Sequence, residues 1–329
     1  MKENTDPVQQ IILSLTVKIN MEDVIKSLCE SHVIEMEKRE VGNVCGLKLM
    51  PTPVLHKSFT VQGVSGVDHI SFFTPDRVWI SDSENNLILT NKEGGRFHHL
   101  RDVRKHNYGV HTMNTTGDLI YRDREDNIIK LSKDNNTKST LIEKPELFIP
   151  ICVYCSRSNA DILVGMIESD TLSEGKVNRY NSIGQYLQTI KHDNIGQKLY
   201  SFPRYITENH NRDVIVSDTR LGVVVTDHTG RHRFTYKGPL PAKELQPRGI
   251  CTDALSYILV CDDKTNTIHK LNKDGQLMSL IPAHRQGIRR PRGLGYDYKA
   301  HLLWVGSSDN NEVCMYRYIK RENDPGEKV

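Results

Sequence analysis

Short apolar runs alternate with polar turns along most of the chain, and they recur in a constant order. The clearest unit begins with Pro247-Arg248-Gly249, continues with an apolar run over residues 257–262, and has another over residues 266–271. Such runs are rich in Val, Ile, Leu and Tyr and are bounded by Gly, Asn and Asp, which is typical of β-strands. Each unit therefore predicts several short strands joined by turns.

The unit recurs about every 40 to 45 residues. Pro-Arg pairs begin three successive units at residues 203, 247 and 291, a period of 44, whereas the unit around residues 149–190 is less regular. Repeats of this length with several strands each are typical of β-propeller blades, and six of them can be counted. The pattern predicts an all-β fold, with a six-bladed β-propeller over residues 55–320.

The two ends of this array are expected to close the ring together. An open array would leave unpaired strand edges, which promote aggregation. The last unit lacks an outer strand before the charged tail at residues 321–329, whereas residues 57–62 precede the first complete unit and have the pattern of a strand. We therefore expect residues 57–62 to supply the outer strand of the last blade.

Residues 1–54 lie outside the repeats and are expected to form a helical extension and a linker. Apolar residues at helical spacing over residues 20–40 predict one helix, and Pro51 and Pro53 indicate the linker. The helix is expected to pack on the propeller or on another helix. The alternative is that it dimerises the protein as part of a coiled coil.

Composition narrows the location and the class of partner. The chain of 329 residues carries 44 Lys and Arg against 41 Asp and Glu, a net charge of +3. This excess is too small to indicate nucleic acid or an anionic membrane by itself. No apolar stretch is long enough to span a membrane or to serve as a secretory signal. These features together favour a cytoplasmic protein without a membrane partner.

The seven cysteines do not form a disulfide framework or a metal site in this pattern. Their number is odd and their spacing is scattered. Cys152 and Cys155 form a Cys-x-x-Cys pair, but no second pair follows at the spacing that a structural zinc site requires. We expect the two thiols to lie in a strand, and we expect neither a metal nor a cofactor.

The repeated arginines are the main candidates for ligand binding. Arg204, Arg248 and Arg292 occupy equivalent positions in successive units, so a radial array places them around one mouth of the central channel. Three guanidinium groups there would suit carboxylates or phosphates. Tyr205 is assigned to the same face. The alternative is that each arginine pairs with an acidic side chain between blades.

Four aspartates end the second strand of their units: Asp82, Asp123, Asp218 and Asp262. A carboxylate at a turn accepts hydrogen bonds from backbone N–H groups, so their regular placement favours a structural role in the turns over catalysis. The chain also has no Gly-x-Ser-x-Gly elbow, phosphate loop or His-Glu-x-x-His helix. No catalytic residue is expected.

Aligned in register, these units resemble NHL repeats. The resemblance rests on Pro-Arg-Gly-Ile at 247–250, Val-Cys-Asp at 260–262, Asn-x-Ile at 266–268 and Asp-Gly at 274–275. It is strongest for the six-bladed propeller at the C-terminus of tripartite-motif (TRIM-NHL) proteins. Full-length members of that family also carry a RING finger and B-boxes, which residues 1–54, with two cysteines, lack.

The resemblance implies a non-catalytic scaffold that binds a protein or peptide, like the substrate-recognition propeller of TRIM-NHL ubiquitin ligases. Any ligase activity would then come from a partner. One alternative is an RNA-binding propeller that acts in post-transcriptional regulation. Another is a calcium-dependent propeller enzyme of the lactonase or lyase kind, although the strand starts offer arginines and apolar residues where calcium needs several oxygen ligands.

Overall fold

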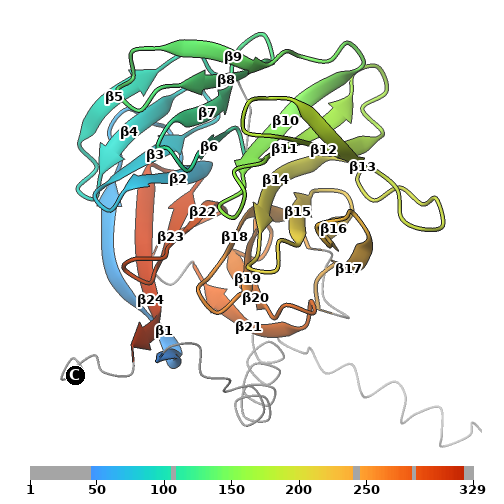
Figure 1. The fold of residues 1–329 in the computed structure, drawn as a ribbon. Helices are drawn as coiled ribbons and strands as arrows, with labels where there is room; N and C mark the ends of the chain where they lie inside the picture. Colours follow the sequence, from blue (N-terminus) through green and yellow to red (C-terminus); the bar gives the residue numbers. More distant parts are fainter. Residues whose placement is uncertain (1–45, 105–108, 240–244, 284–286, 322–329) are drawn as a thin grey trace, which may run out of the picture. The chain divides into compact units, whose positions relative to one another are not determined.

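The computed structural model describes residues 46–321, apart from 105–108, 240–244 and 284–286. Its elements are β-strands, arranged as six four-stranded antiparallel sheets around a central axis (Figure 1). The predicted all-β fold and its six blades are confirmed. The helix expected within residues 20–40 lies outside the described residues. No helix among the described residues is long and apolar enough to cross a membrane.

The strands follow the predicted repeat, with one blade per unit. Blade 1 contains β2 (His69–Thr74), β3 (Arg77–Ser81), β4 (Leu87–Asn91) and β5 (Arg96–Leu100). Blade 2 contains β6 (His111–Met113), β7 (Leu119–Arg122), β8 (Ile128–Leu131) and β9 (Lys138–Ile142). Blade 3 contains β10 (Phe148–Cys155), β11 (Ile162–Glu168), β12 (Gly175–Tyr180) and β13 (Tyr186–Ile190). Blade 4 contains β14 (Pro203–Glu208), β15 (Val214–Asp218), β16 (Gly222–Thr226) and β17 (His232–Tyr236). Blade 5 contains β18 (Pro247–Thr252), β19 (Ile258–Asp262), β20 (Thr267–Leu271) and β21 (Leu277–Pro282). Blade 6 contains β22 (Pro291–Asp297), β23 (Leu302–Ser307), β24 (Glu312–Arg321) and β1 (Leu47–Thr60).

The first strand of each blade lines the axis. β2, β6, β10, β14, β18 and β22 each contact the first strands of both neighbouring blades, so the six form a closed ring. The next strands of each blade lie between two neighbouring sheets, which is why their residues are buried on both faces. β15, β16 and β19 are examples in which every residue is buried.

β1 closes the ring, as predicted. It pairs antiparallel with β24 through partners such as Ser58 with Cys314 and Thr60 with Glu312. Just beyond the strand, Val61 N–H donates to the carbonyl of Asn311 at 2.8 Å, and the Asn311 amide donates back to the Val61 carbonyl at 2.9 Å. The first and last described segments of the propeller are therefore joined in one sheet.

β1 begins at Leu47, earlier than the expected boundary at residue 55. Pro51 and Pro53, which indicated a linker, lie inside this strand. Its pairing with β24 is irregular between Leu49 and Val54, where the prolines stand. Proline lacks the N–H that a central strand needs, but an edge strand tolerates it. The other domain limits stay predictions.

Aromatic residues fill the space between the last blade and the first. Trp304 of β23 has no exposed surface, and its ring centroid lies 5.6 Å from that of Phe59 and 5.3 Å from that of Phe72. Trp79, at the matching position in β3, is 1% exposed. Cys152 and Cys155 are buried free thiols in β10. The closing strand is therefore fixed by side-chain packing as well as by backbone pairing.

This packing predicts that truncation of Phe59 weakens the whole fold. Phe59→Ala is expected to lower the free energy of unfolding by about 3 kcal/mol, because it leaves a cavity against Trp304. Phe97→Ala is the matched control, since Phe97 is 52% exposed and Phe59 is 8% exposed. Urea unfolding followed by tryptophan fluorescence measures both changes. Equal effects of the two substitutions would contradict the role given to the closing strand.

Candidate functional site

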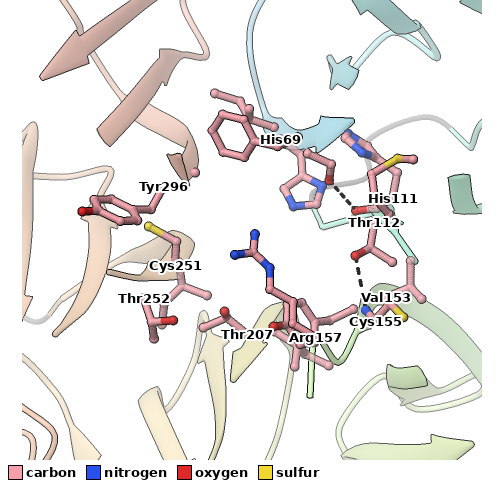
Figure 2. Close-up of a pocket in the computed structure, with 18 of the residues that line it drawn as sticks. His69, His111, Thr112, Val153, Cys155, Arg157, Thr207, Cys251, Thr252 and Tyr296 are labelled. Carbon is pink, nitrogen blue, oxygen red and sulfur yellow. Dashed lines mark hydrogen bonds between the residues drawn. The ribbon is translucent and has the colours of Figure 1, made fainter. Parts of the chain in front are cut away.

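A cavity of about 260 Å³ lies on the propeller axis (Figure 2). All six axial strands contribute to its lining, mostly through residues towards their C-terminal ends. Examples, one from each of these strands in chain order, are Phe72, Met113, Cys155, Thr207, Thr252 and Tyr296. The repeat thus brings together side chains that are far apart in the sequence.

Hydrogen bonds hold part of this lining in place. The Tyr298 hydroxyl donates to the carbonyl of Thr252 at 2.7 Å, and it lies 3.0 Å from the Thr252 hydroxyl. The Thr252 hydroxyl also donates to the carbonyl of Glu208, in the neighbouring blade, at 2.9 Å. Residues from three blades are therefore linked along one wall of the cavity, which fixes the position of the Tyr298 ring.

Two histidines form the most unusual part of the lining. His69 begins β2 and His111 begins β6, and their ring centroids lie 4.4 Å apart. His111 has no exposed surface. Among the residues that the structure describes, neither ring nitrogen of His111 has a hydrogen-bond partner of good geometry, nor does Nδ1 of His69, although the His69 backbone lies close enough to the His111 ring to oppose the lowering of its pKa. Buried polar atoms without a partner are rare in folded proteins, so this pair indicates a site for a ligand or water.

Both imidazoles are neutral at neutral pH. Burial lowers the pKa of His69 to about 3. Burial also lowers the pKa of His111 well below its ordinary value of 6.5, and the neighbouring His69 lowers it further. A neutral imidazole has one nitrogen that accepts a proton and one that donates. The pair therefore offers acid–base groups inside a concave site.

Arg157 is the charged side chain among the residues that line the cavity. Arg157 is exposed and stands two residues after the end of β10 at Cys155. Its side chain points into the cavity in Figure 2. Its guanidinium carbon lies 4.4 Å from the centroid of the Tyr298 ring. The cavity thus has a cation near its opening and the histidine pair further along its wall.

The two cysteines of the lining are not activated nucleophiles. Burial, followed by the charge of Glu208, raises the pKa of Cys155 to about 12. Burial also raises the pKa of Cys251 well above its usual range. Because the thiolate is the reactive form, both side chains act here as small apolar groups.

Tyr205 reaches across the propeller axis beside the cavity. It comes from β14 in blade 4, and its hydroxyl donates to the carbonyl of Asp68, just before β2 in blade 1, at 2.9 Å. These blades are opposite each other in a ring of six. The Tyr205 ring is 1% exposed and lies 5.7 Å from the His69 ring. It therefore belongs to the interior of the channel and not to an open ligand-binding face.

The predicted arginines lie at the other end of the axial strands. Arg204, Arg248 and Arg292 stand near the starts of β14, β18 and β22, and none of them lines the cavity. All three are near enough to Tyr205 to lower its pKa, although burial, followed by Asp68, raises that pKa far more. The structure therefore brings the three together, as expected, on the far side of Tyr205. We call this cluster the arginine mouth.

Acidic side chains from different blades neutralise part of this charge. Asp263 is contacted by Arg248 at 3.0 Å, by Arg290 at 3.2 Å and by Arg292 at 3.5 Å. Arg292 also lies 3.5 Å from Asp68. Burial raises the pKa of Asp68 to about 6, against the opposing effect of Arg292. The alternative weighed from the sequence, pairing between blades, thus describes Arg292, whereas Arg248 pairs with Asp263 inside its own blade.

The four strand-ending aspartates hold turns and the approaches to the axial strands. Asp218 accepts hydrogen bonds from the backbone N–H groups of Ser201 and Phe202 at 2.7 Å each. Asp82 and Asp262 likewise bind the segments before β2 and β18, and Asp123 accepts the N–H of Asn127 at 2.8 Å. None of the four lines the cavity.

Sequence reasoning did not single out His69, His111 or Arg157. The two histidines stand first in the axial strands of blades 1 and 2, which lack the Pro-Arg pair of the later units. A polar ring at the start of an otherwise apolar strand was the available signal. Arg157 carried none, because nothing in a turn sequence shows which way a side chain points.

The described fold and cavity define a six-bladed β-propeller with an axial site. No protein-family model matches the chain, and no curated protein is similar to it in sequence. A gluconolactonase from Xanthomonas campestris is similar in structure, with a TM-score of 0.60, 13% identity, and coverage of 77% of this chain and 86% of that chain.

Two other solved propellers show the same likeness. Virginiamycin B lyase from Staphylococcus aureus has a TM-score of 0.55 and 14% identity, and the match covers 82% of this chain and 99% of that chain. A luciferin-regenerating enzyme has a TM-score of 0.59 and 10% identity, with 80% and 95% covered. At such low identities, these similarities establish the fold.

These comparisons correct the function expected from the sequence. The similar propellers described above are a lactonase, a lyase and a regenerating enzyme. They contradict the expectations of a non-catalytic protein-binding scaffold and of no intrinsic activity. The error came from treating a shared blade repeat as a shared function, although one fold can host many functions.

The calcium dependence included in the enzyme alternative does not fit the residues present. Calcium takes six to eight oxygen ligands, several of them carboxylate. Among the described residues, no group of three or more His, Cys, Asp or Glu side chains is placed to hold a metal ion. Asp68 and Asp263 are engaged by arginines. The cavity itself is lined by hydroxyls, thiols and imidazoles, and it has no carboxylate among its lining side chains to bind calcium.

The buried histidine predicts a pH dependence of stability that substitution isolates. Burial depresses the pKa of His111 in the folded chain, so below about pH 6.5 mainly the unfolded chain binds a proton there. Stability from this group is present above that pH and is lost as the pH falls. Relative to His111→Gln, the unfolding free energy of the wild type should fall by about 1.4 kcal/mol for each pH unit by which the pH drops below about 6.5.

Urea unfolding of both proteins between about pH 5 and pH 7.5 measures this difference. Asp68 and Asp253, whose pKa values burial raises to about 6, contribute the opposite slope. They are present in both proteins, so their contribution largely cancels in the comparison. Parallel pH profiles would show that His111 is not held neutral by the fold.

Proposed function

We propose that this protein is a propeller enzyme that binds a small organic molecule in the axial cavity and acts on it by acid–base catalysis. The observation that carries the proposal is the neutral, closely packed pair of His69 and His111, whose buried nitrogens have no partner among the described residues. A perturbed titratable pair in a concave site is the usual sign of a catalytic centre.

The cavity limits the size of the substrate. Its volume of about 260 Å³ lies just below the roughly 300 Å³ at which pockets for drug-sized ligands begin. Tyr205 is buried where it spans the axis, whereas Arg157 is exposed, so the side of Arg157 is the proposed entrance for the substrate. Apolar and hydroxyl-bearing residues of the axial strands surround it. This environment favours a compact molecule that carries a few polar groups.

His69 is the candidate general base. Figure 2 shows its ring turned into the cavity, and His69 keeps some exposed surface, whereas His111 has none. His69 accepts a proton from water or from the substrate, and His111 positions its ring by packing against it. Two reaction classes follow, hydrolysis of a cyclic or open ester and elimination from the substrate. The similar lactonase and lyase propellers support both.

The low pKa of His69 sets a condition on this chemistry. A general base works best when its pKa lies near the working pH, and burial holds the pKa of His69 at about 3. A negative charge on a bound molecule raises the pKa of a nearby imidazole. The proposal therefore favours a substrate that brings negative charge into the cavity or develops it during the reaction.

The remaining expectations from the sequence stay predictions. They are the TRIM-NHL relationship, a protein, peptide or RNA partner at the arginine mouth, a dimer through the N-terminal segment and a cytoplasmic location. The arginine mouth is the candidate for such a partner, because Arg204, Arg248 and Arg292 gather there. The ion pairs with Asp68 and Asp263 reduce the charge that it presents.

Substitution of His69 tests the proposed function. A panel of small lactones, esters and hydroxy acids is screened for turnover by the wild type. For any substrate found, His69→Gln is expected to lower kcat by roughly 10²- to 10⁴-fold, because general base catalysis contributes that much. His228→Gln is the matched control, since His228 lies in an exposed turn outside the cavity.

Circular dichroism confirms that each variant keeps the fold. A wild type that turns over no member of the panel would contradict the proposal. So would a His69→Gln protein that is folded and as active as the His228→Gln control.

A further inference from the structure

The charge inside the cavity is unbalanced. Arg157 lines it, and none of the other lining residues is an Asp, Glu or Lys. Among the residues that the structure describes, no carboxylate lies within ion-pair distance of Arg157. A guanidinium that faces a cavity and is not engaged by a carboxylate is available to bind an anionic ligand.

Other arginines of the propeller show the contrast. Arg179, which is buried, lies 3.2 Å from a carboxylate oxygen of Asp161 and 3.4 Å from one of Glu208. Arg248 is paired with Asp263 at 3.0 Å. The fold thus provides carboxylates for both arginines, within a blade for Arg248 and also across two blades for Arg179. Arg157 is not part of such a network in the described chain.

Arg157 is nevertheless held in place. Its guanidinium group stacks on the Tyr298 ring at 4.4 Å, and the Tyr298 hydroxyl is bonded to the Thr252 carbonyl at 2.7 Å. Stacking engages the flat face of a guanidinium and leaves the N–H groups at its edge available as donors. The aromatic platform therefore presents those donors toward the cavity, as Figure 2 shows for the side chain.

The histidine pair provides an independent sign of a ligand. His111 has no exposed surface, and both of its ring nitrogens lack a hydrogen-bond partner in the described chain. Nδ1 of His69 is also buried without a hydrogen-bond partner among the described residues. His69, which keeps some exposed surface, is the member of the pair that a molecule in the cavity can reach. The site thus has a cation near its opening and an imidazole along its wall.

We infer that the substrate of the proposed enzyme is a small monocarboxylate, whose carboxylate Arg157 binds while its polar reacting end faces His69 and His111. The inference rests on the proposed function. A guanidinium edge matches two carboxylate oxygens in one plane. A phosphate dianion would need further cations, and the other lining residues supply none. Phe72, Tyr296 and Tyr298 provide an apolar wall for the body of the molecule.

Binding of matched probes tests this inference without relying on activity. Benzoate and hexanoate are compared with benzamide and hexanamide, which have nearly the same shape but no charge, by isothermal titration calorimetry. The wild type is expected to bind each carboxylate more tightly than its amide. Arg157→Gln is expected to weaken carboxylate binding by roughly tenfold to a hundredfold and to leave amide binding unchanged.

Arg77→Gln is the matched control. Arg77 is also exposed, and its guanidinium carbon also lies 4.4 Å from an aromatic centroid, that of Phe97, but it does not line the cavity. This substitution should leave carboxylate binding unchanged. Arg157→Lys, which keeps the charge but not the planar edge, is expected to restore part of the affinity.

Three outcomes would overturn the inference. They are equal affinity for acid and amide in the wild type, carboxylate binding that is unchanged in Arg157→Gln, and no carboxylate binding at millimolar concentration. The proposed function fails separately, through turnover that does not depend on His69. Carboxylate binding that depends on Arg157, in a protein whose turnover ignores His69, would uphold this inference as a binding site and reject the catalytic role.

Discussion

The pairing of β1 with β24 is the interaction on which the rest of the propeller depends. It joins residues near the start of the described chain to its last strand, and Phe59 packs against Trp304 behind the paired backbones. Once the ring is closed, six axial strands must converge on one axis. The cavity is a product of that convergence, because its lining comes from all six strands. No single blade contains enough of the lining to form a site.

Polar groups are buried in two different ways along the propeller axis. At the arginine mouth, charged groups from several blades are paired with one another, as in the contacts of Asp263. On the other side of Tyr205, His69 and His111 are neutral, because burial lowers the pKa of each imidazole. Burying an unpaired ion costs much more free energy than burying a neutral imidazole. Arg157, for which the described residues supply no carboxylate partner, stands where solvent still reaches it.

The sequence predicted the architecture well and the site poorly, for one physical reason. Strand alternation and the 44-residue spacing are local patterns, so the blades and the closing strand near Phe59 could be read directly. The start of β1 was missed because Pro51 and Pro53 resemble a linker, although an edge strand accepts them. The equivalence of the arginines predicted that they would gather. Their acidic partners and the cavity depend on contacts between distant blades, which a repeat pattern does not encode.

Closure by the first strand also constrains how the chain is made. During synthesis, β1 emerges long before β24, and its partner does not exist until almost the whole propeller has been translated. Until then its backbone edge and the Phe59 ring lack their native partners, Val313 and Trp304. Exposed strand edges in incomplete chains favour aggregation. The nascent protein therefore has a long interval in which a chaperone, or slow pairing of the earlier blades, must protect an edge that the finished ring conceals.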